Sequence, residues 1–518
     1  MQPEGRIRLN DAPDKVQAHL ERARRAEEQE RTAEALDAYE AAFEASGRDP
    51  TLAGPLGRAA LRLGLPGAAE QLLRLYLQAQ PDSVQGRADL AHALREQHRY
   101  GEAIELLRQA ITASPEAPGL WTDLGVVRVQ QGEPASALTF LDEALRLHPA
   151  SGRALYYRGH ARADLGDHAG ACADYEAALR GPELDEADHV RIRLAEALSL
   201  LGLGELEVGW RLYRARLSPL SGRRERFEVQ GAPFDFAVGT IGLEGRALLL
   251  VAEQGLGDEI LFGSLIPEVI DALGPDGRLV LAVEPRLVSL FARSFPTTQV
   301  IAHQTRTVDG APVRTVPDLK TPVDYWAPFA APLEALRPVA ARFARTPGFL
   351  KPDPMRVAYW RGWLAGRPGR KVGLLWKSAK LSGERQRLFA PFDAWRPVLA
   401  TPGMTFVNLQ YGDCAEELAF ARAELGVDIL QPPGLDLKED LDGVAALAAA
   451  LDLTLGFSNA SFNLAGAVGS PAWLIAVDRA WTMLGTDRYP WYPQVRCFAA
   501  PEGWPAALEA AAAALATL

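Results

Sequence analysis

A self-similarity with a period of 34 residues runs through residues 1–216 of this 518-residue chain and then stops. Small residues recur in phase along it, and so do prolines: Ala35, Ala69, Ala103, Ala137, Ala171, Pro81, Pro115 and Pro149. A fixed period of this length indicates stacked pairs of helices, because each pair buries its apolar stripe only against the next pair. The chain therefore divides into a repeat array and a second part, residues 217–518.

The clearest unit has a large residue, a Leu-Gly pair, two small residues and a closing proline, at Trp121, Leu124, Gly125, Ala137, Ala144 and Pro149. This order matches the tetratricopeptide pattern. We predict repeats at 16–49, 50–83, 84–117, 118–151 and 152–185. A degraded sixth repeat at 188–216, with Glu207 in place of its second alanine, is expected to cap the stack. Residues 1–216 should form an all-α superhelix that binds an extended or helical protein partner.

Composition excludes several classes of protein. No apolar run has the length of a membrane span, and residues 1–14 lack the apolar core of a secretory signal, so we expect a cytoplasmic protein without a membrane span. The formal net charge of −11 argues against nucleic acid as a general partner. Cys172, Cys414 and Cys497 are odd in number and far apart, which favours reduced structural thiols over disulfides or a metal site.

Residues 217–518 alternate short apolar runs with helical stretches, which indicates an α/β fold with parallel sheets. A connector spotted with proline and glycine is expected at 217–240, followed by two sheets of the nucleotide-binding type in domains 241–366 and 367–518. Helices are expected at 259–273, 352–369 and 505–518. The predicted strands are 247–252, 279–283 and 298–302 in the first sheet, and 372–376, 405–409, 428–430, 453–456 and 472–476 in the second.

The distribution of histidines narrows the available chemistry. All eight histidines lie at or before His303, and seven of them lie in the repeats, so the second sheet domain has none. A Ser-His-Asp triad or a histidine metal cluster is therefore excluded in that domain. Carboxylate, hydroxyl, amide, lysine and arginine groups remain, together with backbone N–H donors.

A glycine-rich turn, 252–259, follows the first strand and precedes a helix. Gly255 and Gly257 can bring backbone N–H groups close to a ligand at the start of that helix. The same spacing is equally compatible with an ordinary tight turn, and Asp258 and Glu259 are also compatible with a purely structural role in the first helical turn.

Two further segments follow strands of the second sheet. The first places cations and a hydroxyl directly after the strand 372–376, at Lys377, Ser378, Lys380, Arg385 and Arg387. Open α/β sheets hold phosphate at this end of a strand. A solvated basic loop is the alternative.

The second of these segments, 457–469, follows strand 453–456. Ser458 or Asn459 can cap a helix whose free N–H groups face an anion. An ordinary capped helix is the alternative, but four polar side chains in six positions exceed what a cap needs.

These segments together resemble a known family. The segments that carry this resemblance are Gly209-Trp210, the 252–258 turn, 373–378, Asn408-Leu409-Gln410-Tyr411-Gly412-Asp413 and 463–467. The chain is similar to bacterial tetratricopeptide-repeat glycosyltransferases with a heptosyltransferase-like catalytic half. The resemblance implies a GT-B pair of Rossmann-type domains, with the acceptor side at 241–366 and the donor side at 367–518. Lys377-Ser378, 381–383 and 436–443 look most like alphaproteobacterial flagellin-modifying members. In those members the repeats bind flagellin, and a nonulosonic acid such as pseudaminic acid is transferred to Ser or Thr.

The resemblance also implies roles for single residues. Asp258 is the implied base that deprotonates the acceptor hydroxyl, and no histidine is expected near it. The implied donor-binding residues are Gly255, Gly257, Lys377, Ser378, Arg385, Arg387, Gln410, Tyr411, Ser458, Asn459, Ala460, Ser461 and Asn463. The cations among them would neutralise donor phosphate in place of a divalent metal, so no cofactor is expected besides a nucleotide sugar, with a CMP-nonulosonate favoured.

The chain departs from heptosyltransferases at one place, where Ser458-Asn459 replaces Asp-Thr and Asn463 replaces His. Either the donor sugar differs or donor turnover has been lost. An uncharged side chain there would avoid repulsion with the carboxylate of a nonulosonic acid. Three functions remain open: a protein glycosyltransferase, a repeat scaffold or flagellin chaperone with a degenerate transferase half, and a transferase acting on lipopolysaccharide or glycolipid. Retained Asp258 favours an enzyme over a scaffold, and the repeats favour a protein acceptor.

Overall fold

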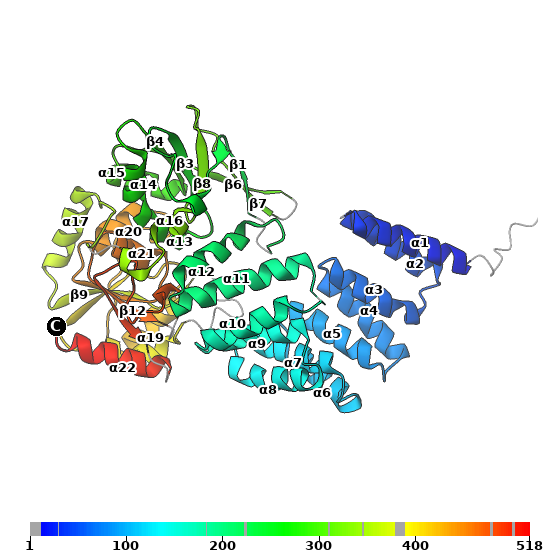
Figure 1. Ribbon diagram of the computed structural model, residues 1–518. Coiled ribbons are helices and arrows are strands. Elements are labelled where there is room, and N and C mark those ends of the chain that lie inside the picture. The colour runs from blue at the N-terminus through cyan, green and yellow to red at the C-terminus, as the bar shows by residue number, and fades with distance from the viewer. Residues whose placement is uncertain are drawn as a thin grey trace, which may run out of the picture. The chain divides into compact units, whose positions relative to one another are not determined.

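The structure is a computed structural model that describes residues 12–29, 31–182, 184–221, 225–308, 311–343, 346–378, 389–476, 480–499 and 503–518. The chain forms two compact units, Met1–Ala161 and Arg162–Leu518 (Figure 1). Within the described residues, none of the helices combines the length and the apolar character that crossing a membrane requires. Cys172, Cys414 and Cys497 are all free thiols, as the sequence predicts.

The first unit is built of antiparallel helix pairs. The first helices of successive pairs begin at Pro50, Val84, Pro118 and Gly152, each 34 residues after the one before, which confirms the predicted starts of the second to fifth repeats. The helices are α1 (Ala12–Glu28), α2 (Thr32–Ala45), α3 (Pro50–Arg62), α4 (Pro66–Ala79), α5 (Val84–Glu96), α6 (Tyr100–Ala113), α7 (Pro118–Gln131), α8 (Pro134–Leu147) and α9 (Gly152–Asp164), the last of which crosses the unit boundary.

Small residues let the paired helices approach closely. Ala69, Ala103 and Ala137 are all fully buried. A Cβ atom on Gly125 would lie 2.6 Å from Leu141 Cγ, so only glycine fits at this helix contact without a shift of its neighbour. The recurrence of small residues in the sequence thus reflects the packing of one helix of each pair against the other.

The second unit begins with the last repeat helices, α10 (His168–Leu179), α11 (Glu186–Leu203) and α12 (Leu206–Tyr213). Two five-stranded parallel sheets follow. In the first sheet the order is β2 (Ala232–Pro233), β8 (Tyr325–Pro328), β3 (Ala247–Val251), β4 (Arg278–Val283) and β5 (Gln299–Ala302). Its helices are α13 (Leu256–Phe262), α14 (Ile266–Leu273), α15 (Val288–Ser294) and α16 (Pro332–Leu336).

In the second sheet the order is β10 (Met404–Asn408), β9 (Arg370–Leu375), β11 (Leu453–Gly456), β12 (Ala472–Ala476) and β13 (Val495–Ala499). Its helices are α17 (Pro354–Ala365), α18 (Arg396–Leu399), α19 (Ala415–Leu425), α20 (Leu441–Ala448), α21 (Ala460–Ala467) and α22 (Trp504–Leu515). The first strand, β9, has β10 on one side and β11 on the other, so the chain reverses its direction of travel across the sheet at β9. This is the order of a doubly wound sheet.

The predicted α/β class with parallel sheets agrees with this structure, and most predicted strands agree within two residues. The strand predicted at 428–430 is wrong: it is a single bridge between Val407 and Leu430. The helix predicted at 259–273 is broken between Phe262 and Ile266, where Gly263 stands in close contact with Phe291 and Phe349 and Pro267 follows. Strands β8 and β13 and the antiparallel pair β6 (Gln304–Val308) and β7 (Ala311–Thr315) were not predicted from the sequence.

The expected connector, 217–240, is partly ordered into strands. Its segment β1 (Arg226–Glu228) pairs in parallel with β7, and β2 forms the edge of the first sheet. Their pairing partners lie about 90 residues further along the chain, which a local pattern does not reveal. The inner domain boundaries at 240 and 366 stay predictions.

Trp210 fastens the last repeat pair to the α/β part. It is 2% exposed in the same hydrophobic core as both sheets, and its indole N–H donates to the Arg337 carbonyl at 2.9 Å. Its ring packs edge-on against Trp491, which also contacts Phe262 and Phe343. The sequence pattern changes at 216, but the compact unit begins inside α9, because α11 and α12 belong to this core.

We predict that Trp210→Ala lowers the free energy of unfolding of the second unit by about 3–5 kcal/mol, through the cavity left and the orphaned Arg337 carbonyl. Val208→Ala on the same helix, where the side chain is 41% exposed, should change it by less than about 1 kcal/mol. Denaturant unfolding of the full chain measures both.

Truncations test the same point independently. Removing residues 1–151 should leave a fragment that unfolds cooperatively, whereas removing residues 1–216 should abolish that transition, because α11 and α12 are lost from the core. A folded 217–518 fragment would contradict this assignment.

Candidate functional site

A cavity of about 750 Å³ is lined by loops that follow strands of both sheets. In open parallel sheets, ligands bind outside the carboxyl ends of the strands, at the point where the strand order reverses. Here Ser378 follows β9 and Ser458 follows β11, on the two sides of that point. The lining residues are Leu194, Leu198, Tyr213, Arg216, Glu225, Glu253, Gln254, Gly255, Leu256, Gly257, Asp258, Arg286, Ser378, Phe389, Tyr411, Leu437, Lys438, Leu441, Ser458, Asn459, Ala460, Ser461, Asn463 and Trp481.

Most of the residues predicted for the site meet in this cavity, although they lie on several separate segments of the sequence. Those that line it are Gly255, Gly257, Asp258, Ser378, Tyr411, Ser458, Asn459, Ala460, Ser461 and Asn463. Arg385 and Arg387, with Lys380, lie outside the described residues. The structure thus brings the glycine-rich turn, the end of β9 and the start of α21 to one place.

Lys377 and Gln410 are engaged elsewhere and are absent from the described cavity lining. The Lys377 ammonium forms an ion pair with Glu417 on α19. The Gln410 side chain is buried, and its Oε1 accepts hydrogen bonds from the backbone N–H groups of Trp376 and Lys377, at 3.0 and 2.9 Å. Gln410 therefore fixes the backbone after β9, next to Ser378. A direct role of either side chain toward a ligand stays a prediction.

The glycine-rich turn is held in an unusual conformation. Gln254 has φ of 63°, in the left-handed region that residues other than glycine rarely adopt, and Gly255 then precedes α13. Asp258 lies in the first turn of α13, and its Oδ2 accepts from the Gly255 N–H at 3.1 Å. Such a backbone persists only where surrounding contacts determine it, and it is typical of functional sites.

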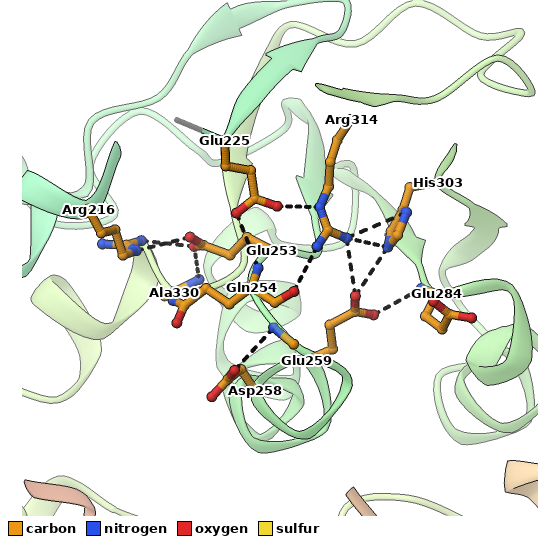
Figure 2. Close-up of polar contacts among 11 residues, drawn as sticks. Arg216, Glu225, Glu253, Gln254, Asp258, Glu259, Glu284, His303, Arg314 and Ala330 are labelled. Atoms are coloured by element: carbon orange, nitrogen blue, oxygen red, sulfur yellow. Dashed lines mark hydrogen bonds and ion pairs between the residues drawn. The ribbon is translucent and has the colours of Figure 1, made fainter. Parts of the chain in front are cut away.

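Contacts from three distant segments hold Gln254. Its backbone N–H donates to the Glu225 carboxylate at 3.2 Å, and its carbonyl accepts from Arg314 at 2.9 Å (Figure 2). Its side-chain amide exchanges hydrogen bonds with the Tyr213 hydroxyl, at 2.9 and 3.1 Å. The last repeat helix, the connector and β7 thus jointly set the turn that carries Asp258.

The neighbouring Glu253 is equally constrained. Its carboxylate is 1% exposed and takes a two-pronged ion pair from Arg216, at 2.8 and 2.9 Å, and a third hydrogen bond from the Ala330 N–H at 3.1 Å. The Arg216 guanidinium lies over the Tyr213 ring, 4.5 Å from its centroid. Breaking one partner of such a buried pair is costly, so Arg216 fixes the position of the turn relative to α12.

A histidine lies closer to the turn than the sequence analysis expected. His303 is 4% exposed, and its Nε2 lies 3.1 Å from the Glu259 carboxylate, which also accepts from the Glu284 N–H and from Arg314 (Figure 2). The prediction that no histidine lies near Asp258 therefore needs a correction, because His303 contacts Glu259, the residue that follows Asp258. His303 and Glu259 are absent from the described cavity lining and are bonded to each other and to Arg314.

Polar residues at the start of α21 line the cavity. Asn459 is the N-cap, and its Oδ1 accepts from the Phe462 N–H at 3.0 Å, as the sequence predicts. Asn459 Nδ2, Ser461 Oγ and Asn463 Oδ1 are buried and have no hydrogen-bond partner among the described residues. Asn463 Nδ2 donates to the Gly257 carbonyl at 3.3 Å, which links α21 to α13. Buried polar atoms of this kind are normally satisfied, so their grouping at one cavity wall points to a ligand.

Several lining residues escaped the sequence analysis. Tyr213 comes from the last repeat helix. Its pKa is raised to about 12, because burial and the negative charge of Asp258 together outweigh the lowering effect of the positive charge of Arg216. Arg286 donates to the Lys438 carbonyl at 2.9 Å and pairs with Glu284, so it joins the first sheet domain to the 436–442 turn. Arg286 follows a strand end, but its chain position carries no motif.

The Tetratricopeptide repeat family matches residues 13–84, 88–151 and 122–188, which confirms the predicted repeats. Protein FlbA of Caulobacter vibrioides is 48% identical over 469 residues, which are 90% of this chain and 78% of FlbA. Among solved structures, a thermophilic TPR protein of Thermus thermophilus is 24% identical, with 35% of this chain and 98% of that chain covered and a TM-score of 0.31. PilF of Pseudomonas aeruginosa is 19% identical, with 40% and 94% covered and a TM-score of 0.32.

We predict that Tyr213→Phe loosens the 252–258 turn without unfolding the unit, because it removes the hydroxyl that holds the Gln254 side chain. One lost hydrogen bond of about 1 kcal/mol should speed amide hydrogen exchange in this turn about 5-fold. Mass-spectrometric exchange measures it, with Tyr359→Phe, an exposed tyrosine on α17, as the control. Unchanged exchange at 252–258 would show that Tyr213 does not hold the turn.

Proposed function

This chain belongs to the family of the Caulobacter protein FlbA, and from that premise we propose that it is a protein glycosyltransferase of the GT-B type. In this proposal the cavity holds a nucleotide sugar, and the repeats recruit a protein acceptor. The fold supports it: two doubly wound parallel sheets contribute the carboxyl ends of their strands to a single cavity, which is the arrangement that the resemblance implies.

One observation carries the proposal. Helices α13 and α21 both begin at the cavity, but of these two only α13 has acidic side chains in its first turn. Asp258 and Glu259 stand in the first turn of α13, whereas the first turn of α21 has no acidic residue. A helix N-terminus favours a negative charge. The start of α21 therefore suits an external anion, and buried Asn459 Nδ2 and Ser461 Oγ add two further hydrogen-bond donors. A nucleotide phosphate is an anion that needs such donors.

The proposed reaction is an inverting displacement. The acceptor oxygen attacks the anomeric carbon and forms the new C–O bond while its proton passes to the Asp258 carboxylate. The bond between the anomeric carbon and the phosphate oxygen breaks, and the nucleotide phosphate keeps the electron pair. The N–H groups at the start of α21 then stabilise the charge that develops on this leaving group.

The cationic part of the site is proposed in two groups. Arg385 and Arg387, which lie outside the described residues, are the phosphate-binding cations predicted for the segment that follows β9. Among the described residues, Arg286 and Lys438 also line the cavity, each with a carboxylate close by: Arg286 pairs with Glu284, and Lys438 lies 3.4 Å from Glu439. These cations take the place of a divalent metal, so the nucleotide sugar is the one small molecule required.

We propose a nonulosonic acid, carried by CMP, as the donor. The described cavity wall at α21 has no carboxylate at Ser458 or Asn459, which suits a sugar that bears its own carboxylate. The proposed acceptor is flagellin, on Ser or Thr. The resemblance to flagellin-modifying transferases and the kinship with FlbA both support this choice. The reaction is proposed to take place in the cytoplasm.

Asp258→Asn tests the base. The amide oxygen of asparagine can still accept from the Gly255 N–H, so the turn is kept, but the group no longer takes up a proton. We expect transfer to fall by about 10²–10⁴-fold while donor affinity is retained. The intact mass of flagellin incubated with the full chain and a panel of nucleotide sugars measures transfer.

Asp271→Asn, on α14 and absent from the described cavity lining, is the matched control. Normal turnover by Asp258→Asn would remove Asp258 from the mechanism. A flagellin complex whose mass stays unchanged with every donor would favour the scaffold or chaperone instead.

Asn459→Asp tests the anion site. Aspartate keeps the N-cap acceptor for the Phe462 N–H but replaces a donor amide with a charged oxygen that faces the anion. We expect the dissociation constant for the nucleotide sugar to rise at least about 10-fold, with stability unchanged. Calorimetric titration measures the affinity, and thermal unfolding is the control for the cap. Equal affinity of variant and wild type would place the phosphate elsewhere.

A further inference from the structure

One wall of the cavity is apolar and comes from the last repeat pair. Leu194 and Leu198 stand one helical turn apart on α11 and therefore on one face. Both are partly exposed at the cavity, whereas Ala197 and Leu201 beside them on the same helix are fully buried in the core. Trp481, also partly exposed, lines the cavity from the short helix Trp481–Met483, which packs against α11.

This wall is fixed in place. Gly204 ends α11 in the left-handed conformation, and its backbone touches Gly485: a Cβ atom on Gly485 would lie 2.6 Å from the Gly204 nitrogen. The short helix at Trp481–Met483 packs against α11, and the Trp481 ring lies 6.3 Å from the Tyr213 ring, centroid to centroid. The apolar wall is thus held in place by the packing of α11, a repeat helix, against the second sheet domain.

The apolar wall lies on the side of the base. Its neighbour Tyr213 is hydrogen-bonded to the side chain of Gln254, at 2.9 and 3.1 Å, in the turn that carries Asp258. The polar groups suited to a charged donor come from other elements, namely the start of α21 and the cations Arg286 and Lys438. An acceptor hydroxyl must approach Asp258, and in a protein substrate it brings neighbouring side chains with it.

We infer that Leu194, Leu198 and Trp481 form a subsite for an apolar side chain next to the acceptor hydroxyl. This inference rests on the proposed function and deepens it, because it names the acceptor class: a serine or threonine flanked by an aliphatic or aromatic residue. The last repeat pair then selects the modified residue in addition to completing the core. One leucine-sized side chain in such a pocket gives a preference of about 10–100-fold.

The experiment uses the full chain and two fluorescein-labelled nonapeptides with a central serine, one flanked by leucine and one by glycine. Fluorescence anisotropy measures binding, and mass spectrometry measures transfer from the nucleotide sugar. The test variant is Leu194→Ser/Leu198→Ser. The control is Leu203→Ser, on the same helix with 43% of the side chain exposed and absent from the described lining. Leu198→Met keeps an apolar surface and serves as the conservative variant.

Wild type, Leu203→Ser and Leu198→Met should bind the leucine-flanked peptide about 10-fold or more tightly than the glycine-flanked one. The double variant should lose that difference, with the KM for the donor unchanged. Equal binding of both peptides by wild type would overturn the inference. A raised donor KM with the peptide preference kept would also overturn it, since the wall would then hold the sugar.

The proposed function fails separately. If wild type transfers no sugar under any donor, but the double variant still abolishes the leucine preference in binding, the subsite stands and the transferase does not. Thermal unfolding of the double variant and of Leu198→Met shows whether a loss of binding reflects the wall or the fold.

Discussion

The burial of Trp210 is the constraint on which the arrangement of the second unit depends. Its indole stands between α12, the Arg337 carbonyl and Trp491, and so ties one repeat helix to loops of both sheet domains. A tryptophan contributes a large apolar area and a single N–H donor that needs a partner when buried. Both needs are met here at once. Because α12 is held this way, Tyr213 and Arg216 reach the site at fixed positions.

The site itself combines strain with buried charge. Gln254 holds a left-handed backbone, and the buried Arg216–Glu253 pair takes two charges out of water, which costs hydration free energy. Neither feature is explained by stability. Both follow from a requirement for position: the ion pair, the hydrogen bond that Gln254 donates to Glu225 and the one that it accepts from Arg314 hold the turn so that Asp258, in the first turn of α13, lies at the cavity.

Local signals predicted much of this structure. The 34-residue period gave the helix boundaries because helix packing repeats with the sequence, and Asn459 was recognisable as a cap because capping involves residues three apart. Contacts between distant residues were not predictable. The conformation of Gln254 is imposed by Arg314, 60 residues away, and Lys377 is drawn toward Glu417, 40 residues away. The wrong prediction of a strand at 428–430 has the same cause, because an apolar pattern does not show how many residues of a neighbouring strand lie close enough to pair.

At position 463, where the heptosyltransferases that the chain resembles have histidine, the structure shows which contacts the asparagine side chain makes. Its amide N–H donates to the Gly257 carbonyl, and a Cβ atom on Gly257 would lie 3.3 Å from that nitrogen, so the side chain spans the narrow gap between α13 and α21. The orientation leaves Oδ1 buried as an acceptor without a partner among the described residues. A ligand group that meets Oδ1 must donate a hydrogen, whereas one that meets Asn459 Nδ2 must accept one. Under the proposed function, phosphate or carboxylate therefore belongs at Asn459, and a hydroxyl or acylamino N–H of the sugar belongs at Asn463.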